Sequence, residues 1–169
     1  KRYRFFDIGT DHYYYDDYEN ERSIADTSDN SYIPALQTLI QMCRENDNFK
    51  CAISLSGCTI ELLEIHSPLV LDLVRQLVDT GRVELVATPY SHGLSSLANL
   101  NCFREEVLHL CDKVEEMFGQ RPKSFRNSCS IYSDDIGHTV ADMGFKTMLT
   151  EGAKHILGWK SPHFVYHCA

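Results

Sequence analysis

The chain has 169 residues, of which 43% are hydrophobic, 24% charged and 11% aromatic. This length and composition are typical of one folded globular domain and exclude a peptide hormone, a fibrous protein and a disordered chain. Sixteen Lys and Arg residues against 24 Asp and Glu residues give a formal net charge of -8. The positive charge that dominates nucleic-acid affinity is therefore missing, and we expect no nucleic-acid partner.

The termini and cysteines bear on the cellular context. No run of about 18 apolar residues occurs, and the polar, aromatic opening lacks the apolar stretch of a secretory signal, so we expect no membrane association. The seven cysteines are odd in number and include no CxxC pair, which favours reduced thiols in a cytoplasmic protein. Because the chain begins at Lys1 rather than Met, we expect a piece of a larger protein.

Helical and strand patterns alternate from the first third of the chain onward. Apolar residues at helical spacing over 33–43 predict a helix that Ser31 caps and that ends near Asn46. The apolar run over 51–55, closed by Gly57, predicts a buried strand.

The same alternation continues through the middle of the chain. A helix is predicted between Pro68 and Gly81, and a strand over 82–87 follows at once. The next helix is expected to start behind Asn101, and a short strand is expected over 124–127.

The last elements complete four strand-to-helix steps. Ser133 is predicted to cap a helix that carries Asp134 and Asp135 in its first turn, and a strand-like segment over 145–150 follows. Strands that alternate with helices of this length predict parallel pairing through helical crossovers, and hence an α/β sheet or barrel. No linker or repeat divides the chain, so we expect a single domain over residues 1–169.

Parallel α/β folds place their chemistry where strands end and helices begin, so the segments after the strands are the first to inspect. Glu61 and Glu64 are three residues apart and suit either acid–base work or a solvated helix face. His92 suits a bond to a sugar hydroxyl, a metal or a structural hydrogen bond. Trp159 is either a stacking platform or an interface anchor.

The opening segment is rich in aromatic and acidic residues, which suits either sugar binding or irregular packing. Asp11 and His12 could join His92 as metal ligands, yet no recognised metal-binding spacing occurs. We therefore expect no metal and no cofactor.

Four segments, taken in order, resemble a known family: FFDIGTDHYYYDDYENERSI, SLSGCTIELLE, GRVELVATPYSHGL and SFRNSCSIYSDDIGHTVADMGFKTMLTEGAKHILGW. They are similar to the N-terminal half of the catalytic domain of glycoside hydrolase family 57, closest to its α-amylase-like bacterial members. The resemblance implies an incomplete, TIM-like (β/α)7 barrel that acts on α-1,4-glucans with retention of configuration. It also implies a Glu nucleophile after the fourth barrel strand and an Asp acid/base after the seventh, which would lie beyond Ala169.

The chain departs from this family at the nucleophile. Counting back three residues from Tyr132 leads to Cys129, where the family pattern has Glu. Retaining hydrolysis needs two carboxyl groups roughly 5–5.5 Å apart. A free thiol has a pKa of about 8.5, so only a few per cent of it is ionised at neutral pH. We therefore expect weak or lost hydrolysis with retained binding of an α-glucan or maltooligosaccharide.

Two alternatives remain at this stage. One is an active glycoside hydrolase whose displaced nucleophile is Asp134 or Glu61, and the other is a metal-dependent polysaccharide deacetylase with Asp11, His12 and His92 as ligands. An open barrel half exposes apolar strand edges, so we also expect pairing with the missing C-terminal half or self-association. The predicted site has Cys129 at the nucleophile position, and the predicted substrate-binding residues are Asp11, His12, Glu61, His92, Tyr132 and Trp159.

Overall fold

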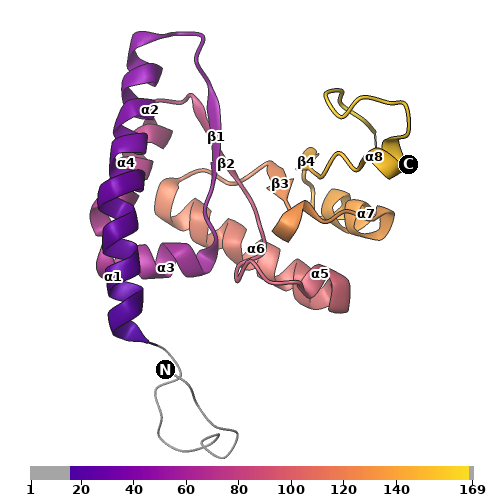
Figure 1. Cartoon of the computed structure of the whole chain (residues 1–169), viewed down its shortest axis with the longest axis horizontal. Coiled ribbons are helices and arrows are strands. Elements are labelled where there is room, and N and C mark those ends of the chain that lie inside the picture. Colours follow the sequence, from indigo (N-terminus) through magenta and orange to yellow (C-terminus); the bar gives the residue numbers. More distant parts are fainter. Residues whose placement is uncertain (1–15, 168–169) are drawn as a thin grey trace, which may run out of the picture.

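The computed structural model describes residues 16–167. Within this range helices and short parallel strands alternate, which confirms the predicted α/β class (Figure 1). The strands are β1 (Cys51–Ser54), β2 (Val83–Val86), β3 (Ser124–Arg126) and β4 (Thr147–Leu149). The helical elements are α1 (Asp17–Thr27), η2 (Ser28–Tyr32), α2 (Ile33–Glu45), α3 (Gly57–His66), α4 (Pro68–Asp79), α5 (Ser95–Ala98), α6 (Leu100–Phe118), η3 (Ser128–Ser130), α7 (Asp134–Asp142) and α8 (Lys154–Leu157).

The first helix is longer than the sequence predicts. α1 continues through the π-helical segment η2 into α2, so the predicted start at Ser31 is wrong (Figure 1). The amide of Ile33 donates to the carbonyl of Ser28, five residues earlier, and this wide turn directly precedes Pro34. In a regular α-helix the proline ring would clash with the carbonyl four residues before it, and the π-segment accommodates that conflict.

The ends of the two later helices α6 and α7 follow the predicted chemistry except at the start of α6. The Ser133 hydroxyl caps α7, and α6 ends at Gly119, whose φ of 68° is in the left-handed region. α6 starts earlier than expected, because the side chain of Asn99 accepts the amides of Asn101 and Cys102 at 2.9 and 3.2 Å. Asn99 is therefore the N-cap, and the prediction of Asn101 in that role is wrong.

The strands pair in chain order. β1 pairs with β2 in register Cys51 with Val83, and β3 pairs with β4, both in parallel. Ala87 joins the two pairs, since its amide donates to the carbonyl of Ser124 and its own carbonyl accepts the amide of Arg126. The carboxyl ends of the strands therefore lie along one edge, as the helical crossovers require.

A glutamine side chain completes the seam between β2 and β3. The amide nitrogen of Gln120 donates to the carbonyl of Val83 at 2.9 Å, and its oxygen accepts the amide of Leu85 at 2.6 Å. These two backbone groups of β2 thus have a side chain, not a strand, as their partner. The sheet is divided into two strand pairs at this seam, yet these backbone groups of Val83 and Leu85 remain hydrogen-bonded.

Helix α6 connects two hydrophobic clusters. Leu110, Val114 and Phe118 of α6 belong to the larger cluster, which also contains buried residues of α2, α3, α4 and β2. Phe103 and Val107 belong to a second cluster, with buried residues of β3 and α7. Because one helix contributes to both clusters, it fixes the ends of β2 and β3 relative to each other.

The helices cover one face of the β1–β2 pair. Val83 and Leu85 lie in the larger cluster, whereas Ala52 and Ser54 on the opposite face are exposed. Side chains alternate along a strand, so Glu84, which pairs with Ala52, lies on the face away from the helices. In a βα barrel that uncovered face is the inner one.

Candidate active site

The β3–α7 connection is a tight turn that carries Cys129. This residue and Ser130 have φ values of 52° and 55°, in the left-handed region that residues with a Cβ seldom occupy. Two backbone bonds close the turn, from Ser130 to the carbonyl of Asn127 and from Ile131 to the carbonyl of Ser128. Cys129 is exposed just after the carboxyl end of β3, where the family resemblance predicts the nucleophile.

The end of β4 meets this turn. The amide of Glu151 donates to the carbonyl of Ser130 at 3.2 Å. A second contact to Ser130 comes from Arg126 at the end of β3, whose guanidinium lies 3.5 Å from the Ser130 hydroxyl. The carboxyl ends of β3 and β4 therefore lie next to each other at one edge of the sheet, as the sequence predicts for parallel strands.

Tyr132 and Asp134 lie just beyond the turn. The Tyr132 hydroxyl donates to the Asp134 carboxylate at 3.2 Å, and Asp134 is in the first turn of α7. An acidic side chain is favoured there by the helix dipole. Tyr132 is 41% exposed.

His92 lies in the loop after β2. Its φ is 53°, and its Nδ1 atom is 3.2 Å from the hydroxyl of the buried Thr88. Its amide donates to the carbonyl of Pro89. The ring is thus tethered through one nitrogen while the side chain remains exposed, which leaves Nε2 for hydrogen bonding.

Glu61 and Glu64 share helix α3, as predicted, but each has its own partner. The Tyr90 hydroxyl donates to Glu61 at 2.5 Å, and Lys113 of α6 forms an ion pair with Glu64 at 2.9 Å. Tyr90 also packs edge-on against His109, with ring centroids 4.4 Å apart. Glu61 therefore connects α3 with the loop after β2, and Glu64 connects α3 with α6. Each carboxylate has a partner on another element, so the two are not paired with each other.

The environment of this pair alters the ionisation of its neighbours. Burial, followed by the hydrogen bond to Glu61 and the charge of that carboxylate, raises the pKa of Tyr90 to about 12. Burial also raises the pKa of Cys58, and the carboxylates of Glu61 and Glu106 add to this effect. Both groups therefore keep their protons at neutral pH, and the thiol of Cys58 is a poor nucleophile.

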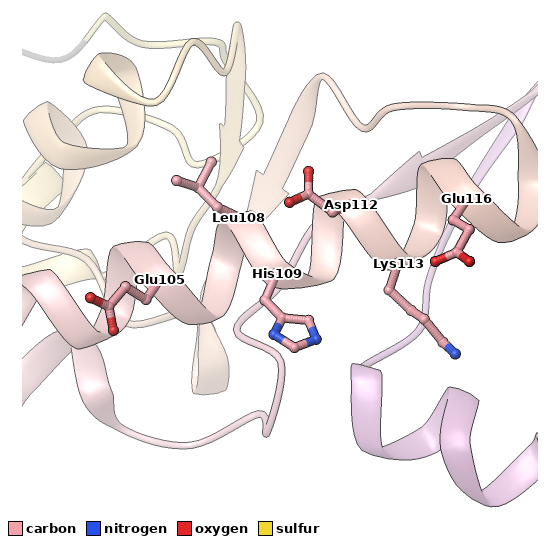
Figure 2. A pocket seen from close by; sticks show the side chains of 6 residues that line it. All are labelled: Glu105, Leu108, His109, Asp112, Lys113 and Glu116. Carbon is pink, nitrogen blue, oxygen red and sulfur yellow. The ribbon is translucent and has the colours of Figure 1, made fainter.

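A shallow groove follows α6 beside this network. Its volume is about 460 Å³, and Figure 2 shows the side chains that line it. All of them come from α6, and the predicted site residues are not among them. The lining residues are Glu105, Leu108, His109, Asp112, Lys113 and Glu116.

The remaining predicted residues follow the last helix or lie outside the described range. Trp159 follows α8 and is 93% exposed. Asp11 and His12 precede residue 16 and lie outside the described residues. Between residues 16 and 167, no three His, Cys, Asp or Glu side chains are grouped so that they could hold a metal ion.

Two residues with buried polar atoms were missed by the sequence analysis. Glu84 lies mid-strand on the face away from the helices, and its Oε1 atom is buried without a hydrogen-bond partner among the described residues. A carboxylate inside the apolar strand VELV was the available signal, because buried carboxylates need partners. Asn127 is fully buried below the Cys129 turn, and no local sequence pattern marks it.

The cysteines of the described residues carry free thiols. Cys43, Cys51, Cys58, Cys102, Cys111 and Cys129 are free. Burial raises the pKa of Cys111 to about 11.

Across residues 16–167, the helices are too short or too polar to cross a bilayer.

Parallel strands joined by helical crossovers, with polar loops gathered at their carboxyl ends, are typical of a barrel-type α/β fold. The model of glycosyl hydrolase family 57 matches residues 2–169. The chain belongs to this family, and the resemblance seen in the sequence is confirmed.

Individual relatives agree with this assignment. The chain is 36% identical over 154 residues to a Methanocaldococcus jannaschii protein named "Putative alpha-amylase", covering 90% of this chain and 33% of that one. It is 25% identical over 122 residues to an alpha-amylase from Pyrococcus abyssi, covering 72% of this chain and 18% of that one. The chain thus spans a third or less of the length of these relatives.

Solved structures support the fold. A 4-alpha-glucanotransferase from Thermococcus litoralis superposes with a TM-score of 0.64 at 18% identity, over 75% of this chain and 19% of that one. A CE4 family pseudoenzyme from Bacillus anthracis gives a TM-score of 0.56 at 17% identity, over 71% of this chain and 38% of that one. The described strands and helices therefore form part of a TIM-like barrel, as predicted.

Proposed function

We propose that the chain is part of a family 57 catalytic barrel that binds α-1,4-glucans or maltooligosaccharides but cleaves them weakly or not at all. The observation that carries the proposal is the place of Cys129, exposed on the turn after β3 where the family pattern has a Glu nucleophile. Membership of the family and the alpha-amylase names of two relatives support the substrate class.

The chemistry explains why a cysteine at this position would suppress hydrolysis. A retaining glycosidase needs one carboxylate to attack the anomeric carbon and a second carboxyl group to protonate the leaving oxygen. A neutral thiol is a weak nucleophile until a base or a cation ionises it. A thioglycosyl intermediate would also need geometry shaped for sulfur. We therefore expect the rate to fall by several orders of magnitude, as it does when other catalytic nucleophiles are lost.

Binding does not depend on the nucleophile. His92 offers a ring nitrogen that has no hydrogen bond to residues 16–167 at the β2 end, and Tyr132 is partly exposed at the β3 end. Trp159 offers an exposed ring that suits stacking on a sugar face. Glu61 is proposed only to support this edge through Tyr90, because its carboxylate accepts the Tyr90 hydroxyl. Asp11 and His12 remain proposed contacts from the opening segment.

The barrel itself needs a further partner. The inner face around Ala52 and Ser54 is exposed, and Leu149 of β4 is 50% exposed. We propose that residues 1–169 form one part of a single domain, and that the rest of the barrel or a second copy covers these surfaces. Light scattering of the 1–169 chain tests this, with a dimer or aggregate expected and a stable, soluble monomer opposing it.

The function is tested by measuring binding and cleavage on the same full-length protein. Calorimetry with maltohexaose should give binding, and a reducing-sugar assay should give release at background level. Release that Asp134→Asn abolishes would instead identify a displaced nucleophile. Stoichiometric zinc that copurifies with the protein and supports release of acetate from an acetylated polysaccharide would identify a deacetylase. Absence of maltohexaose binding would reject the proposal.

A further inference from the structure

One buried side chain organises the turn that carries Cys129. Asn127 has no exposed surface, and its amide nitrogen donates to the hydroxyl of Ser96 and to the carbonyl of Ile131, each at 3.0 Å. Its amide oxygen accepts the backbone N–H of Ser128 at 2.9 Å. The same amide group therefore contacts both ends of the turn and also joins the turn to α5.

The turn that it contacts is unfavourable in isolation. Cys129 and Ser130 are consecutive residues with positive φ, and neither is a glycine, an asparagine or an aspartate. Such conformations persist only where surrounding contacts fix them. Besides the Asn127 side chain, the turn is held by its own backbone bonds, by the amide of Glu151 just after β4 and by the contact of the Arg126 guanidinium with the Ser130 hydroxyl.

The surroundings of Asn127 explain why an apolar residue could not replace it. Its partners are a buried hydroxyl, a backbone carbonyl and a backbone amide, all of which would lose a hydrogen bond. Ser95 and Ser128 already have buried hydroxyls without hydrogen-bond partners among residues 16–167. Loss of the Asn127 side chain would therefore add further unpaired polar groups to a region that already contains two.

We infer that Asn127 is a positioning residue that fixes the direction in which residue 129 leaves the end of β3. Through Ser96 it also sets the distance between this turn and the loop that follows β2, which carries His92. The inference rests on the proposed function, in which residue 129 and His92 line one sugar-binding edge. It is independent of whether residue 129 is a cysteine or a carboxylate.

The first test measures the turn directly by amide hydrogen exchange. Asn127→Ala should speed exchange at Ser128, Ser130 and Glu151 by at least tenfold. The amide of Cys51, which bonds to the Arg82 carbonyl in the β1–β2 pair, should change by less than twofold. Equal acceleration at both places would show a general loss of stability and would overturn the inference, as would no acceleration at the turn.

Two further variants control this test. Ser96→Ala removes only the bond to α5, so exchange should rise at Ser130 while the Ser128 amide keeps its bond to Asn127. This variant keeps the inference testable if Asn127→Ala does not fold, and an unchanged turn would then contradict it. Asn30→Ala is the matched control, because the exposed side chain of Asn30 donates to the Asp26 carbonyl within the same continuous helical segment.

The second test separates positioning from binding in the full-length protein. In a Cys129→Glu background, Asn127→Ala should lower kcat for maltohexaose at least tenfold while KM changes less than threefold. A change in KM alone would contradict a role in orienting residue 129. If the Cys129→Glu protein is inactive, the proposed restoration fails, yet the exchange experiment still decides the role of Asn127.

Discussion

Gly57 and Tyr90 make the most demanding packing contact near the candidate site. A Cβ placed on Gly57 would overlap the ring of Tyr90. The ring cannot readily retreat, because His109 packs against it at 4.4 Å and its hydroxyl is bonded to Glu61 at 2.5 Å. We therefore predict that Gly57→Ala lowers the free energy of unfolding by about 1–3 kcal/mol, the usual cost of overpacking.

The effect of Gly57→Ala on the free energy of unfolding should change sign once the Tyr90 ring is absent. Gly57 is the first residue of α3, where alanine is the better helix former by up to about 1 kcal/mol. Once Tyr90→Ala has removed the ring, Gly57→Ala should be neutral or stabilising. Urea unfolding followed by circular dichroism on the four proteins of this cycle measures both values. Equal effects in the two backgrounds would refute the close contact.

Gly93→Ala is the matched control for this cycle. Its φ is not positive, and an added Cβ would lie 3.1 Å from the exposed Ser91 hydroxyl, which can move. The unfolding free energy should change by less than about 0.5 kcal/mol. A loss as large as that of Gly57→Ala would mean that any added methyl group destabilises the protein.

Further predictions concern ionisation, packing and ligand contact. The raised pKa of Tyr90 means that the folded state holds this proton more tightly than the unfolded state, so the free energy of unfolding should fall as the pH rises from 10 to 12. In urea unfolding, the Tyr90→Phe variant should therefore lose less stability between pH 9 and 11.5 than the unaltered protein. Phe125→Ala should cost about 3–5 kcal/mol in the same assay because Phe125 is fully buried, whereas Phe164→Ala at a 71% exposed position should cost under about 0.5 kcal/mol. Trp159→Ala should weaken maltohexaose binding by about three- to tenfold in calorimetry, and unchanged affinity would exclude a stacking role.

Local chemistry predicted much of the fold. Pro68, Ser133 and Gly119 mark helix ends in the sequence and in the structure, because each acts through its own backbone or its nearest neighbours. The start of the first helix was missed because the π-segment before Pro34 lets the helix continue, and single-residue signals do not encode such a change of hydrogen-bond register.

The site could be predicted only in outline. The sequence places Cys129 after a strand, but its left-handed backbone lies in a turn that Asn127 links to Ser96 of α5 and that Glu151 contacts from beyond β4. The shared helix of Glu61 and Glu64 was likewise predictable, whereas their partners on other elements were not. Contacts between elements decide which carboxylates remain available for chemistry.

We propose that the barrel edge still binds glucans and that Cys129 limits their cleavage. The most direct measurement is reducing-sugar release from maltohexaose by the full-length protein and its Cys129→Glu and Cys129→Gln variants at equal, calorimetrically verified occupancy. We predict background release for the unaltered and Gln proteins and release at least a hundredfold above background for the Glu protein. Unchanged release by the Glu protein, or strong release by the unaltered protein, would contradict the claim.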